Sequence, residues 1–145
     1  MIRAELRATG KLYEAILIAR VAPRFLPCNC RAACCCGKRQ NTEWINAIAY
    51  LADQVRGTAL AGCTVNGLLR REYVRRYFTK KAERIQLDAL AERYGIDRHT
   101  VSAHASKVAQ MLGSTRKGKE ITPGLEDMAF AAIEARLAEC GMVGV

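Results

Sequence analysis

The sequence is poor in the features that mark membrane and secreted proteins. No apolar run approaches the roughly 18 residues that a membrane-spanning helix needs. The N-terminal segment MIRAELRATG lacks the layout of a signal peptide, because its charged residues alternate with apolar ones. With only 3 prolines in 145 residues, the chain has few helix breakers. These absences predict a soluble, cytoplasmic, largely helical protein with no membrane partner.

Motifs of the common enzyme classes are also missing. The chain has no G-x-x-x-x-G-K-[ST], no G-x-S-x-G and no H-E-x-x-H, and nothing resembles the acidic cluster of a metal-dependent nuclease. Its 2 histidines both fall in one predicted helix, which is poor material for acid–base chemistry. We therefore expect no enzymatic activity.

Acidic residues are scarce, and the basic excess is uneven along the chain. The net charge is +9, with +5 in residues 1–63, +8 in residues 64–119 and −4 in residues 120–145. A concentrated positive charge is typical of a segment that binds a polyanion, although a solvated basic face kept for solubility is the alternative. The distribution favours nucleic acid as the partner of residues 64–119.

Apolar residues at helical spacing recur through most of the chain. They predict an all-α fold with helices that end before Pro23, begin at Asn41 or Thr42 and begin again at Val65, followed by helices over 87–94, 98–112 and 123–140. The last would place Pro123 in its first turn behind a Thr122 cap. The segment Ser114–Thr122, STRKGKEIT, reads as a mobile basic linker, and no strand is expected. We divide the chain into residues 1–63, 64–113 and 114–145.

The stretch LAERYGIDRHTVSAHASKV, residues 90–108, predicts a sharp bend between two helices. Gly95 can adopt the left-handed conformation that ends the first helix, and Asp97 can cap the second. Val101, Ala105, Val108 and Leu112 would form the buried stripe of the second helix, with Ile96 filling the corner. A small residue (Ala91) one turn before the glycine, followed by the glycine turn and a buried valine, is typical of a helix-turn-helix, although an ordinary helical hairpin is the alternative.

Side chains off that stripe are short or polar and would not obstruct a DNA groove. The helix residues that we expect to read bases or hold phosphates are Arg98, His99, Thr100, Ser102, Ala103, Ser106 and Lys107. His104 lies on the other side, where we expect it to be a partly buried packing residue.

A second group of basic residues lies upstream in LLRREYVRRYFTKKAER. Among them Arg75 and Arg76 are the candidates for holding DNA phosphates beside the reading helix. Some arginines of this segment could instead pair with the acidic C-terminal helix, which carries Glu126, Asp127, Glu134 and Glu139.

Five of the 7 cysteines fall within PCNCRAACCCGKR. Clustered thiolates on a loop suit a structural Zn²⁺ site, because the metal would stabilise a segment with little core of its own. The candidate ligands are Cys28, Cys30, Cys34 and Cys35, with Cys36 or Cys63 as substitutes. No C-x-x-C pair is present and adjacent side chains diverge, so free or buried thiols remain the alternative.

With these residues in view, LxxLAERYGIDRHTVSAHASKVAQML resembles the helix-turn-helix of sigma-factor domain 4. The order of CNCRAACCCG, LLRREYVRRYF and that helix pair resembles the Q-type late antitermination proteins of phages and prophages. Lambda-type members carry paired C-x-x-C zinc ligands that this chain lacks, and the helix over 121–140 has no clear counterpart.

The resemblance implies a protein of the bacterial host cytoplasm that binds double-stranded DNA near a phage late promoter. It would load onto a paused, sigma-containing RNA polymerase and suppress pauses and terminators. Three alternatives stay open: a helix-turn-helix repressor or activator, a small terminase subunit for DNA packaging, and a partner-binding module in which the helix pair is only a scaffold. The oligomeric state is left open.

Overall fold

Helices form most of the described chain, because Ala, Leu and Arg, which favour helices, are frequent and prolines are few. The computed structural model describes residues 7, 9–28 and 37–139, and the expected all-α class is confirmed. The described helices are α2 (Lys11–Val21), α3 (Thr42–Gly57), α4 (Gly67–Phe78), α5 (Leu87–Tyr94), α6 (Arg98–Leu112) and α7 (Leu125–Glu139), with a 3₁₀ turn η1 (Lys81–Glu83). None of these helices is long and apolar enough to cross a membrane.

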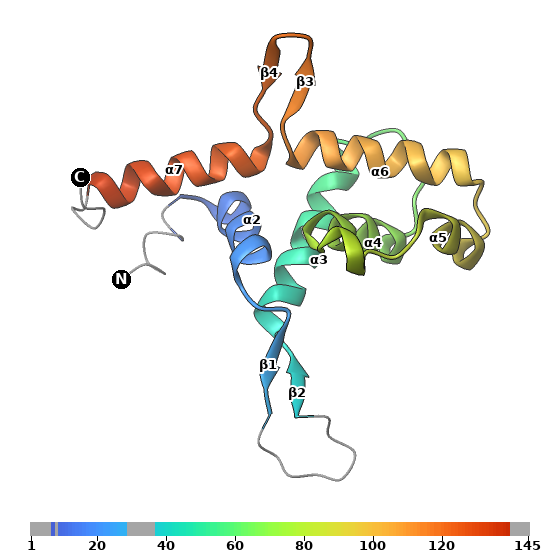
Figure 1. Cartoon of the computed structure of the whole chain (residues 1–145), viewed down its shortest axis with the longest axis horizontal. Helices are drawn as coiled ribbons and strands as arrows, with labels where there is room; N and C mark the ends of the chain where they lie inside the picture. Colours follow the sequence, from blue (N-terminus) through green and yellow to red (C-terminus); the bar gives the residue numbers. More distant parts are fainter. Residues whose placement is uncertain (1–6, 8, 29–36, 140–145) are drawn as a thin grey trace.

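Helix α3 is the centre of the core, and its start is fixed by Asn41. The Asn41 side chain accepts a hydrogen bond from the Glu43 amide at 3.1 Å and donates to the Pro23 carbonyl at 2.8 Å, so it caps α3 and holds the preceding segment against it. The apolar stripe of Trp44, Ile48, Leu51 and Val55, spaced by four, three and four residues, is buried. One side of α3 packs on α2 and another on α4 (Figure 1).

The remaining helices pack on this core and on one another. Helix α4 packs on α6, α5 packs on α6, and α7 lies against α2 (Figure 1). Across the α2–α7 contact, Glu126 forms an ion pair with Arg20 at 2.9 Å. In the described part of the chain this acidic residue is therefore paired with α2 and not with the arginines of α4.

Two short β-hairpins correct the expectation that the chain contains no strand. Strands β1 (Phe25–Pro27) and β2 (Lys38–Gln40) pair antiparallel, and so do β3 (Thr115–Lys117) and β4 (Glu120–Thr122). The segment predicted to be a mobile linker is the second hairpin. These strands were missed because each has 3 residues and lacks a clear apolar alternation.

Several helix ends differ from the prediction. Helix α7 begins at Leu125, because Thr122 is paired in β4 and the Asp127 carboxylate accepts from the Gly124 amide. Helix α4 begins after an Asn66 cap, with Val65 buried just ahead of it. Helix α2 begins after Gly10, whose φ is 103°, and Cys140, the predicted end of the last helix, lies outside the described residues.

Candidate nucleic-acid interface

The bend between α5 and α6 has the geometry that the sequence predicts. Gly95 adopts φ 63° and ψ 34°, and its amide donates to carbonyls at the end of α5. The Ile96 amide donates to the Ala91 carbonyl at 3.0 Å, which satisfies a second group at the helix end. Ile96 is half-buried and packs against the core, so it fills the corner as expected.

Asp97 starts α6 by capping it. Its carboxylate accepts from the His99 amide at 3.0 Å, and the helix begins at Arg98. Val101, Val108 and Leu112 are fully buried, while Ala105 is half-buried against the core. Leu90 and Ala91 of α5 belong to the same buried core as these residues of α6. The orientation of α6 is therefore fixed by packing and not by the turn alone.

The opposite side of α6 carries the residues predicted to read DNA. Ser102 is half-buried, and the exposed members of the set are Arg98, His99, Thr100, Ala103, Ser106 and Lys107. The turn places Arg98 beside Asp88 of α5, with which it forms an ion pair whose side chains are 65% and 70% exposed. A pair so exposed contributes little stability, so exchanging Asp88 for a phosphate would cost little.

Sequence reasoning missed Gln110. This exposed residue lies one turn after Ser106, and it extends a surface stripe formed by His99, Ala103 and Ser106. The spacing of four, three and four was available from the sequence. Glutamine can form a bidentate pair with adenine, so this side chain belongs with the candidate reading residues.

One flank of α6 is bordered by the segment that joins α3 to α4. The Thr58 hydroxyl lies 2.9 Å from the Met111 sulfur, and the Lys107 amine lies 3.9 Å from the Cys63 sulfur. Lys107 is nevertheless exposed. The segment therefore limits the surface of α6 on this side without covering the stripe of His99 and Ala103.

Arg75 and Arg76, which are predicted to hold phosphates, each have a partner within the protein. Arg75 forms an ion pair with Glu72 at 3.0 Å, and Arg76 donates to the Ile85 carbonyl at 3.3 Å. Both are half-buried in a pocket that is also lined by Arg24 and Arg93, and no residue of α6 lines that pocket. Burial, followed by the charge of Arg84, lowers the pKa of Arg76. The structure thus does not bring these two guanidinium groups together with the α6 stripe in one site.

His104 is a packing residue, as expected. It is 8% exposed, and its Nδ1 lies 3.2 Å from the Tyr73 hydroxyl of α4. Burial raises the pKa of Tyr73 to about 12, and burial followed by the charge of Lys107 lowers the pKa of His104 below 6.5. Both groups are therefore neutral near pH 7, and a neutral His104 can accept the Tyr73 proton. This hydrogen bond ties α4 to α6.

The lowered pKa of His104 predicts a stability that declines in mild acid. As pH falls through 6.5, the unfolded chain takes up a proton that the folded chain resists, so the free energy of unfolding decreases until the folded pKa is passed. The slope is at most about 1.4 kcal/mol per pH unit for one proton. Urea unfolding between pH 8 and pH 5 should show this extra loss in the wild type and not in His104→Gln. Equal slopes in the two proteins would contradict it.

The predicted zinc site stays largely untested, because Cys30, Cys34, Cys35 and Cys36 lie outside the described residues. Within the described ranges, no group of three His, Cys, Asp or Glu side chains could hold a metal. The Cys28 amide donates to the Gly37 carbonyl at 2.9 Å, next to the β1–β2 ladder. Both ends of the cysteine-rich segment are thus held together by the backbone, whether or not a metal binds.

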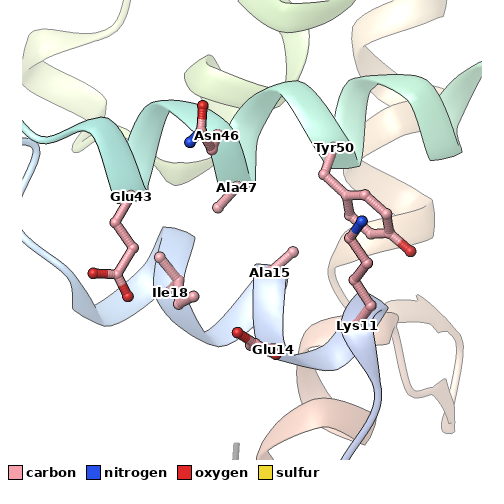
Figure 2. Close-up of a pocket in the computed structure, with 8 residues that line it drawn as sticks. All are labelled: Lys11, Glu14, Ala15, Ile18, Glu43, Asn46, Ala47 and Tyr50. Carbon is pink, nitrogen blue, oxygen red and sulfur yellow. The ribbon is translucent and has the colours of Figure 1, made fainter. Parts of the chain in front are cut away.

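A separate small pocket lies between α2 and α3 (Figure 2). Its floor includes Ala15, Ile18 and Ala47, and the Lys11 amine lies 4.9 Å from the centre of the Tyr50 ring. Lys11 and Tyr50 face each other at one end in Figure 2. Both helices contribute charged side chains to the lining.

Comparison with known proteins gives no relative: no family model, no curated protein and no solved structure matches the chain.

Proposed function

We propose that this protein is a sequence-specific regulator of transcription that binds double-stranded DNA by placing α6 in the major groove. The observation that carries the proposal is the exposed side of α6, where short and polar side chains follow a capped start and no described segment covers them. A side of this kind fits within a groove about 12 Å wide. The partner helix α5 and the buried stripe hold that side outward.

Charge supports the same partner. The segment over 64–119, which contains α4, α5 and α6, has a net charge of +8. Phosphate neutralisation supplies most of the sequence-independent affinity for DNA, so such a segment would be attracted to any duplex before it reads a site. Base contacts from Arg98, His99 and Gln110 would then provide the specificity.

Within this class, we propose a Q-type antiterminator that acts in the bacterial cytoplasm on paused, sigma-containing RNA polymerase. The support is the sequence resemblance together with a second surface, formed by residues far from α6 in the sequence. An apolar depression lined by Ile18, Val21, Ala22 and Leu26 lies beside the β1–β2 hairpin, and Val21 is 67% exposed. Exposed apolar surface of this kind is suited to a protein partner.

Three measurements test the proposal in order. Footprinting on phage late-promoter DNA, or selection from random duplexes, asks whether the chain protects a defined sequence; its failure would favour the scaffold alternative. Run-off transcription past a terminator then separates an antiterminator, which gives read-through, from a repressor or activator, which does not. Native mass spectrometry completes the set, because a small terminase subunit should form rings and a repressor a dimer.

Arg98→Ala should weaken binding to the selected site by about 1–3 kcal/mol and relax the base preference at one position, if Arg98 reads a base as proposed. Gel shifts on the selected site and on single-base variants measure both effects. Asp88→Asn is the matched control: it removes the same ion pair but leaves the Arg98 guanidinium free, so affinity should be unchanged or higher. Unchanged affinity and preference in Arg98→Ala would remove Arg98 from the reading set.

A further inference from the structure

We infer that the β3–β4 hairpin is a second DNA-binding element, which contacts the sugar–phosphate backbone bordering the groove that α6 enters. This inference rests on the proposed function, because it assumes that α6 binds duplex DNA. It assigns a role to a segment that the sequence presented only as a linker.

The hairpin lies at the C-terminal end of α6. In Figure 1 it projects from the junction of α6 and α7, on the side of α6 opposite α4 and α5. Its base follows Leu112, which lies about 15 Å along the helix axis from Ser102 at 1.5 Å per residue. A recognition helix contacts base edges chiefly through its N-terminal residues. With the first turns of α6 on the bases, the hairpin at the other end of the helix would lie towards the sugar–phosphate backbone that borders the groove.

The base of the hairpin is fixed relative to α6. The Gly124 backbone packs directly on the carbonyl group of Gly113, and the Gly113 amide continues the hydrogen bonding of α6 through the Ala109 carbonyl at 2.8 Å. The strands pair Thr115 with Thr122 and Lys117 with Glu120. A paired hairpin on a fixed base has fewer conformations than an unpaired linker, so it would lose less conformational entropy on binding.

Composition points to phosphate as the ligand. The segment over 114–122 contains Arg116, Lys117, Lys119 and one acidic residue, Glu120, for a net charge of +2. Gly118 has φ 62°, as a two-residue hairpin turn requires at its first position, and it places Lys119 in the exposed tip. Basic residues on a projecting two-stranded tip suit a polyanionic backbone and would contact it without reading sequence.

The test compares two double variants that remove the same charge. Lys117→Ala/Lys119→Ala neutralises the β3–β4 hairpin, and Lys38→Ala/Arg39→Ala removes two positive charges from strand β2 of the other hairpin. The affinity of each protein for the selected duplex and for an unrelated duplex is measured from 50 to 300 mM salt. Circular dichroism confirms that each variant is folded.

The hairpin variant should lose affinity for both duplexes equally, by between about 10-fold and 100-fold at 0.1 M salt. The slope of log K against log salt should become shallower by roughly 2, as expected for two lost phosphate contacts. In the β2 control, the affinity and the salt slope should both change much less. Equal losses in the two variants would show an effect of net charge alone and overturn the inference. Unchanged DNA binding with lost read-through would also overturn it, because the hairpin would then contact a protein. If the wild-type chain binds no duplex, the proposed function itself fails.

Discussion

Ala103→Glu should lower the affinity for duplex DNA by about 100-fold or more while leaving the melting temperature nearly unchanged. Ala103 is exposed in the middle of the α6 stripe, between His99 and Ser106, so a larger side chain displaces nothing in the folded protein. In the complex, the new carboxylate would lie among phosphates and base edges. Like charges brought together in an interface cost several kcal/mol, and 1.4 kcal/mol corresponds to a factor of ten.

Ala131→Glu is the matched control. Ala131 is also an exposed helical alanine, but it lies on α7, so the substitution changes the net charge equally without entering the proposed interface. Its DNA affinity should fall only slightly, through the loss of long-range attraction. Gel shifts at one salt concentration and thermal melts compare the three proteins. The same small loss in both variants would mean that α6 does not lie in a groove.

The second large effect is on stability. Gly124→Ala should lower the free energy of unfolding by roughly 3 kcal/mol and the melting temperature by about 10 °C. A Cβ at this buried position would overlap the carbonyl group of Gly113 and lie 2.6 Å from the Leu112 carbonyl oxygen. These atoms belong to the backbone, so the junction of α6, the β3–β4 hairpin and α7 would have to separate.

Gly57→Ala provides the contrast. Gly57 ends α3, and an added Cβ there meets no atom within 4 Å. Alanine loses less conformational entropy on folding than glycine, so this variant should be neutral or more stable by up to about 1 kcal/mol. Chemical denaturation of both variants tests the pair. A Gly124→Ala protein as stable as Gly57→Ala would show that α6 and α7 do not meet closely at this point.

The features of α6 that could be predicted are those encoded over a few neighbouring residues. A glycine that ends a helix, an aspartate that caps the next and a valine stripe each depend on backbone geometry within one or two turns, so Gly95, Asp97 and Val101 have the predicted roles. The buried state of His104 followed from the same periodicity. The exposed stripe is the complement of that buried set.

The partners of Arg75 and Arg76 were not predictable in the same way. Periodicity places both on the surface of α4, but their neighbours Arg24 and Arg93 come from distant parts of the chain. A long basic side chain can turn towards solvent, a carboxylate or a carbonyl, and the choice depends on which groups the fold brings near. The sequence therefore identified basic residues without identifying which of them face the same surface as α6.

The sequence alone determined the helical class, the bend at Gly95 and the residues that α6 leaves exposed, because each is set by short-range propensity and helical spacing. Tertiary structure alone decided that STRKGKEIT forms a hairpin. Its strands are short and polar, with little local preference for pairing, and their ends meet because Gly113 and Gly124 allow two backbones to touch between α6 and α7. Such a contact depends on how both helices pack, so a local sequence pattern does not predict it.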